Sequence, residues 1–101
     1  AAGTYRSRAI APAFGVQRHK AKLYNVTDSA DVLFGTSEIT LSGGSSVQTS
    51  STVLGQFTIA GSKAFEIKHQ VQSSLSSVGY GIASNFGVSE VYTIVEIWKV
   101  G

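Results

Sequence analysis

The chain has 101 residues, a net charge of +2 with only 14% charged residues, and no cysteine. A chain of this length forms one domain, so residues 1–101 are expected to fold as a single unit. The sparse charge excludes the strongly basic footprint of nucleic-acid-binding proteins, and the lack of cysteine excludes disulfides as a support for the small core. No apolar run is long enough to cross a bilayer as a helix, so membrane insertion is not expected.

The first half of the chain predicts four strands. Its apolar residues alternate or cluster between Gly, Ser and Thr, a pattern typical of a sandwich of short antiparallel strands rather than of helices. The expected strands cover residues 4–10, 16–26, 31–34 and 38–41. The first is expected to stop near Pro12, because proline cannot donate a hydrogen bond to a central ladder.

The second predicted strand carries a basic stripe. Alternation places Ala21 and Leu23 on one face of this strand. The opposite face carries Arg18, Lys20 and Lys22. This stripe could meet anionic sugars or lipopolysaccharide phosphates, or it could be the solvated face of an edge strand. The residues leave both interpretations open.

The second half of the chain predicts four further strands, at residues 47–59, 65–72, 79–84 and 90–100. The strand at 65–72 alternates most regularly, so we expect one core face and one solvated face. A turn is expected near 85–87, and the loops that look least like scaffold are the serine-rich segments at 42–46 and 73–77.

The last predicted strand is apolar on both faces. One face carries Val91, Val95 and Ile97, and the other carries Tyr92, Ile94, Trp98 and Val100, interrupted by Glu96. A strand of this kind is buried on both faces. The core of a sandwich covers one face, and either a second subunit or a loop of the same chain covers the other; we favour the subunit. The residues expected at this interface are Tyr80, Tyr92, Ile94 and Trp98, with Tyr80 in a neighbouring segment of small residues.

Catalytic chemistry has few candidates in this sequence. There is no cysteine nucleophile, no phosphate-binding glycine loop and no His-Glu-x-x-His motif. We therefore expect no catalytic residue, no metal site and no cofactor. His19 and His69 could be ligands or bases, but partly buried, hydrogen-bonded histidines are far commoner.

Two acidic residues have structural explanations. Asp28 lies in a predicted turn, where it is expected to make a local hydrogen bond rather than to bind calcium. Glu96 interrupts an apolar face and is expected to form an ion pair with Arg6, Arg8 or Lys99.

Aromatic and basic side chains supply the candidates for ligand binding. Several rings lie near predicted turns, where an exposed ring offers an apolar face to a sugar: Tyr24, Phe34, Phe86 and Tyr92. The candidate ligand-binding residues are Tyr24, Phe86, Arg18 and Lys20.

Five segments carry a resemblance that covers nearly the whole chain. They are APAF at 11–14, RHKAKLYNVTD at 18–28, LFGTSE at 33–38, GQFTI at 55–59 and VYTIVEIWK at 91–99. Together these segments resemble the C-terminal receptor-binding domain that forms the tip, or knob, of bacteriophage tail fibres.

The resemblance implies a jelly-roll β-sandwich, similar in architecture to the tumour-necrosis-factor and complement globular heads, that assembles as a homotrimer. It implies a virion protein of the tail fibre, outside the cell, that adheres to a bacterial surface polysaccharide or protein. The chain begins at Ala1 without an initiator methionine, which fits the distal part of a longer fibre protein. No binding residue is carried over, because the variable loops of the family would set specificity.

Two other functions remain open from the residues. A structural cap that trimerises a fibre or virion would use the same scaffold and would show a bland polar tip. A glycan depolymerase would need two carboxylates about 5–10 Å apart in a cleft. The six carboxylates of this chain are scattered along the sequence, which disfavours the enzyme.

Overall fold

The computed structural model of the chain describes residues 1–42, 47–73, 79–81, 84, 86–87, 89 and 91–101. The strands are β1 (Gly3–Phe14), β2 (Val16–Asn25), β3 (Ala30–Phe34), β4 (Glu38–Ser42), β5 (Gln48–Ile59), β6 (Phe65–Val71) and β7 (Ile94–Lys99). The described residues form no helix, and so they offer none that could span a membrane. The predicted all-β class is confirmed.

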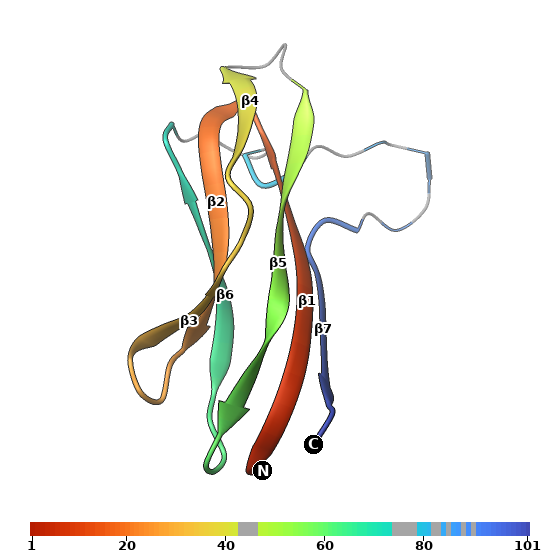
Figure 1. The fold of residues 1–101 in the computed structure, drawn as a ribbon. Coiled ribbons are helices and arrows are strands. Elements are labelled where there is room, and N and C mark those ends of the chain that lie inside the picture. The colour runs from red at the N-terminus through yellow and green to blue at the C-terminus, as the bar shows by residue number, and fades with distance from the viewer. Residues whose placement is uncertain (43–46, 74–78, 82–83, 85, 88, 90) are drawn as a thin grey trace.

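Two antiparallel sheets pack together as a β-sandwich (Figure 1). The first, called sheet A, has the strand order β5-β1-β7. The second, called sheet B, is built around β2. Residues 22–25 of β2 pair with both β3 and β6, so these two strands lie on opposite edges of β2. The beginning of β2 pairs with β4 on the same edge as β3.

The core lies between the inner faces of β1, β2 and β5. Small and medium apolar side chains fill it, and the fully buried members are Ala9, Ala11, Ala21, Leu23 and Val53. Partly buried residues surround this cluster: Val32, Leu33, Phe57, Phe65 and Ile67. Three of the five central residues are alanines, so the sheets approach closely and the core has little volume. A core of this size stabilises a 101-residue domain only modestly.

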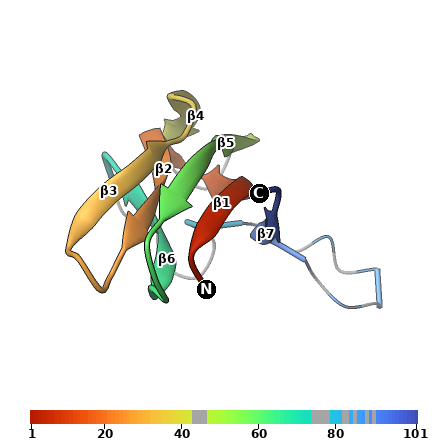
Figure 2. The same cartoon turned by 60° about the horizontal axis from the view of Figure 1, so that its bottom comes forward.

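One side of the sandwich is closed by hydrogen bonds between the sheets. Thr36, in the link from β3 to β4, donates its backbone N–H to the Thr52 carbonyl at 2.9 Å. The Thr52 N–H donates to Thr36 Oγ1 at 2.9 Å, and Ser51 Oγ donates to the Thr36 carbonyl at 2.6 Å. Seen from the end, β4 and β5 lie side by side (Figure 2). No strand pairing among the described residues joins β6 to β7 on the other side.

The prediction that the first strand stops near Pro12 is wrong, because β1 continues to Phe14. The N–H groups of Thr4 and Phe14 donate to Gly101 and Gly79, on the side of β1 away from β5. Backbone N–H groups alternate between the two edges of a strand, so the nitrogen of Pro12 also points away from β5. The β7 ladder on that side ends at Ile10, so Pro12 removes no bond from a strand pair.

The last two strands also differ from the prediction. Gly79 and Tyr80 form a turn rather than the start of a strand. Gly81 has a φ of 142°, which residues other than glycine rarely adopt. The ring of Tyr92 occupies the space that a Cβ atom at this position would need. Residues 82–83 lie outside the described residues. β7 begins at Ile94, four residues after the predicted start.

The other five strands match the prediction to within about two residues at either end. Most of the predicted loops at 42–46 and 73–77, and part of the turn at 85–87, lie outside the described residues.

Candidate functional site

The outer face of sheet B collects basic, aromatic and amide side chains from three strands. Residues that pair directly across an antiparallel ladder project to the same face. Lys20 pairs with Gln70, Lys22 pairs with both Lys68 and Phe34, and Tyr24 pairs with Glu66 and Asp31. We call this surface the basic face; its residues are Arg18, Lys20, Lys22, Tyr24, Asp31, Phe34, Glu66, Lys68, Gln70 and Gln72.

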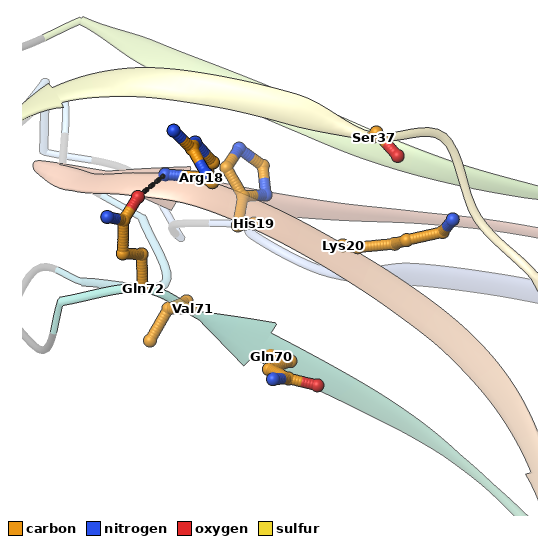
Figure 3. A pocket seen from close by; sticks show the side chains of 7 residues that line it. All are labelled: Arg18, His19, Lys20, Ser37, Gln70, Val71 and Gln72. Carbon is orange, nitrogen blue, oxygen red and sulfur yellow. Dashed lines mark hydrogen bonds between the residues drawn. The ribbon is translucent and has the colours of Figure 1, made fainter.

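Two adjacent hollows lie along the basic face. The first has a volume of about 480 Å³ and is lined in part by Arg18, Ser37 and Gln72 (Figure 3). The second has a volume of about 380 Å³ and includes Phe34 and Lys68. Lys20 and Gln70 line both hollows. Together they form an open furrow that follows the β2–β6 pair.

The Arg18 end of the furrow is held by two hydrogen bonds of the Arg18 backbone. The Gln72 N–H donates to the Arg18 carbonyl at 2.8 Å, and the Arg18 N–H donates to Gln72 Oε1 at 3.4 Å, as Figure 3 shows. These bonds fix the β2–β6 register where the hollow opens. The Arg18 guanidinium therefore projects from a rigid strand and not from a loop.

Lysines crowd the centre of the basic face. Lys22 and Lys68 stand directly opposite each other, a like-charge arrangement that destabilises a sheet. Neighbouring groups offset this repulsion. Lys22 Nζ lies 2.7 Å from Asp31 Oδ1, and Lys68 Nζ lies 3.5 Å from Glu66 Oε1 and 3.8 Å from the centroid of the Tyr24 ring.

Two cations of the basic face have no such carboxylate. Among the described residues, none lies within 4.0 Å of the side-chain nitrogens of Arg18 or Lys20. Lys20 Nζ instead lies 5.6 Å from the centroid of the Phe34 ring. Phe34 is 62% exposed, which is unusual for a phenylalanine in a strand. The furrow therefore offers a solvated ring beside two available positive charges.

The structure brings together three of the four residues predicted to bind a ligand. Arg18, Lys20 and Tyr24 share the basic face, whereas Phe86 is 83% exposed and lines none of the hollows described in this chain. The sequence reasoning missed three partners, which are Lys68 and Gln70 on β6 and Gln72 directly after it. Their alternation marks them as solvated, but only the pairing of β6 with β2 places them beside the basic stripe.

A buried histidine pair lies on the opposite side of the same strands and reaches toward sheet A. His19 Nδ1 and His69 Nε2 are 2.8 Å apart, and His19 Nε2 lies 2.7 Å from Thr49 Oγ1. Thr49 Oγ1 donates its hydrogen to the Ile39 carbonyl at 3.2 Å, so it accepts one from His19 Nε2. His19 Nδ1 is then the acceptor for the N–H of His69. The neutral pair thus has a single proton arrangement that links β6, β2 and β5.

Burial keeps both rings neutral near pH 7. Burial, together with a smaller contribution from the neighbouring His19, lowers the pKa of His69 to about 4. Burial also lowers the pKa of His19, against the opposing pull of the Glu38 carboxylate. The Tyr80 ring packs on His69 with centroids 5.2 Å apart. Within the described part of the chain, no three His, Asp or Glu side chains gather as a metal site. These contacts agree with the predicted role of partly buried, hydrogen-bonded histidines.

Acid is expected to destabilise the domain through this pair. The pKa of His69 falls from 6.5 in the unfolded chain to about 4 in the folded one, so the unfolded chain binds more protons between these values. The stabilisation is complete above pH 6.5 and is lost as the pH falls toward 4. Because the ring is only half-buried, solvent screening limits the loss to about 1–2 kcal/mol.

Urea unfolding at pH 7 and pH 4.5 would measure this loss. The control is His69→Gln, which keeps an N–H donor and removes the titration of this ring. The variant should lose less stability between the two pH values than the parent. An equal loss in both chains would contradict the assignment.

β7 presents apolar side chains to solvent on both faces. Ile94 and Trp98 lie on the outer face of sheet A, and Val95 and Ile97 lie on the inner face. All four are 40–47% exposed. The expectation that the sandwich core covers one face is therefore wrong, because β7 is the edge strand of sheet A and extends beyond the cover of sheet B.

The four predicted interface residues are divided between two places. Ile94 and Trp98 share the outer face of β7, and Tyr92 lies just before that strand against Gly81. Tyr80 instead contacts β6, where its hydroxyl donates to the His69 carbonyl at 3.4 Å.

The two acidic residues singled out from the sequence have partners. Glu96 Oε1 lies 3.4 Å from Arg8 Nη1, and both side chains are about half exposed, so the pair contributes little stability. Asp28 accepts a bond from Asn25 Nδ2 at 2.9 Å and contacts Lys63 Nζ at 3.1 Å. Both predicted structural roles are confirmed.

Comparison with known proteins gives no relative from which a function could be inferred. No family model matches the chain, and no curated protein and no solved structure is significantly similar to it. The features that bear on function are therefore the basic face and the exposed apolar side chains of β7.

Proposed function

We propose that the chain is a recognition module that binds a bacterial surface polysaccharide or protein and assembles as a homotrimer, as the tip domain of a bacteriophage tail fibre does. The observation that carries the proposal is the basic face. This face combines an exposed aromatic ring, carboxamides and cations on hydrogen-bonded strands. Such groups can bind a polar ligand without reacting with it. In this proposal the sandwich is a jelly roll and the protein belongs to the virion.

β7 supports the homotrimer. Its apolar side chains are half exposed on both faces, and its outer edge pairs with no other strand of the described residues. An exposed apolar edge strand invites association with another chain. A second and a third copy of this chain would cover the apolar side chains of β7 that sheet B leaves exposed.

A trimer also suits a shallow binding site. The furrow is open along its length, and open sites of this kind bind each ligand weakly. Three such sites on one rigid particle turn weak binding into high avidity for a surface that repeats its ligand, by a factor of about 10²–10⁴. The assembly and the binding face therefore support one function.

Two measurements test the proposal. Light scattering on a sizing column should give a mass of three times 10.6 kDa, and a monomer would contradict the trimer. An array of purified bacterial surface polysaccharides, both neutral and acidic, should retain the protein at some of its positions. A trimer that no surface polysaccharide and no bacterial cell retains would refute the recognition function and favour a structural cap.

A further inference from the structure

We infer that the basic face takes an acidic polysaccharide, and that the ligand carries negative charges at intervals along its chain, separated by neutral sugars. This inference rests on the proposed recognition function and narrows its ligand. It is carried by the charges of the face, by their spacing along β2 and by the groups between them.

The charge of the basic face is unbalanced. Arg18, Lys20, Lys22 and Lys68 supply four cations, and Asp31 and Glu66 supply two carboxylates. The two carboxylates contact Lys22 and Lys68. The remaining cations, on Arg18 and Lys20, line the larger hollow together. A negative ligand in the furrow would bind these two cations and would also relieve the repulsion between the opposed lysines.

The spacing of the cations indicates an extended ligand. Arg18, Lys20 and Lys22 are alternate residues of one strand, so their Cα atoms follow each other at about 6–7 Å. The two hollows are adjacent, share Lys20 and Gln70 in their walls, and are open to solvent. A single anion would be held in an enclosed pocket with converging donors. A row of separated charges beside an open furrow instead matches a chain that repeats its charge.

The groups between the cations match a sugar chain. Gln70, Gln72 and Ser37 offer donors and acceptors for hydroxyl groups. Phe34 offers an exposed ring face beside Lys20. Two available cations are few for a nucleic acid, which carries a charge on every residue and binds mainly through its phosphates. A polysaccharide with charges separated by neutral hydroxyl-rich stretches fits better.

The test compares one polysaccharide with and without its charge. The probes are hyaluronan oligomers, in which a neutral sugar separates successive carboxylates, and the same oligomers with each carboxylate reduced to an alcohol, titrated into the protein by calorimetry at low salt. The charged oligomer should bind about tenfold more tightly than the reduced one or better. Added salt should narrow the difference, because the cations are exposed.

Three variants assign the binding to the basic face. Arg18→Gln and Lys20→Gln should each weaken binding of the charged oligomer by about three- to tenfold. Phe34→Ala should weaken both oligomers to a similar extent. Lys63→Gln is the matched control, since Lys63 lies between β5 and β6, lines neither hollow, and its loss removes the same charge elsewhere. Arg18, Lys20 and Phe34 are exposed and Lys63 lies outside the strands, so the variants should remain folded.

The outcomes separate this inference from the proposed function. Equal affinity for the charged and reduced oligomers would overturn the acidic ligand and leave recognition of polysaccharides intact. The same conclusion would follow if the array retained the protein at neutral polysaccharides and at no acidic one. Tighter binding of a single-stranded oligonucleotide than of the charged hyaluronan oligomer, or an equal loss in Lys63→Gln, would also overturn it. Failure of every polysaccharide and of bacterial cells would refute the proposed function itself.

Discussion

Replacing Gly35 with alanine is expected to lower the free energy of unfolding by about 3 kcal/mol. Gly35 follows β3 at the closed side of the sandwich, and its N–H donates to the Ala21 carbonyl at 2.7 Å. A Cβ at this position would stand 2.7 Å from both that carbonyl oxygen and Ser51 Oγ, and 3.0 Å from Val53 Cγ2. Real Cβ atoms do not approach other atoms so closely, so part of the structure must move.

None of the three neighbours of Gly35 can move at low cost. The Ala21 carbonyl belongs to the central strand of sheet B. Ser51 Oγ accepts from the Ala21 N–H at 3.0 Å and donates to the Thr36 carbonyl at 2.6 Å. Val53 is fully buried in the core. The substitution therefore strains the bonds that join the two sheets.

Gly61→Ala is the matched control for this prediction. A Cβ at Gly61 meets no atom within 4 Å, and its φ lies outside the left-handed region. The control should change stability by less than about 0.5 kcal/mol. Urea unfolding of both variants measures the difference, and a Gly35→Ala chain as stable as Gly61→Ala would show that the sheets are not joined as described.

The double substitution Ile94→Glu with Trp98→Glu is expected to reduce the solution mass from that of a trimer to that of a monomer. Both side chains lie on the outer face of β7, and each would place a charge where a second subunit is expected to pack. Desolvating an unpaired charge in an interface opposes association by several kcal/mol. The isolated subunit should tolerate the change, because both positions are about 40% exposed already and Trp98 faces Arg6 across the β1–β7 pair.

Light scattering and far-ultraviolet circular dichroism, measured together, check this second prediction. The spectrum should keep its strand signal while the mass falls to one third. Ile39→Glu is the control, since Ile39 is another exposed apolar residue but lies on β4 in sheet B. A double variant that stays trimeric would show that β7 is not the assembly strand.

Local alternation was enough to predict most of the strands. The inward positions of β2, β5 and β6 follow from a period of two residues, which depends only on backbone geometry. Pro12 and Gly81 were misjudged because their effect depends on which neighbour lies beside them. Pro12 is tolerated because the β7 ladder stops at Ile10. The bend at Gly81 accommodates the ring of Tyr92, eleven residues further along the chain.

The candidate site was half predictable for the same reason. Alternation put Arg18 and Lys20 together on one face, because both belong to a single strand. Gln70 joins them only through a pairing of strands fifty residues apart, and no local pattern specifies such a pairing. The His19–His69 bond has the same origin. Long-range contacts between correctly predicted strands are thus what the sequence alone leaves undetermined.

The position of β7 determines when the apolar surface can form. Among the strands of the described residues, β7 pairs with β1 alone, so its place in sheet A depends on a strand about ninety residues earlier in the chain. On the ribosome, β1, β2 and β5 can join before β7 has been synthesised. The residues that would hold subunits together therefore dock onto a sandwich that already exists. Synthesis in this order would keep unfinished chains from associating with each other.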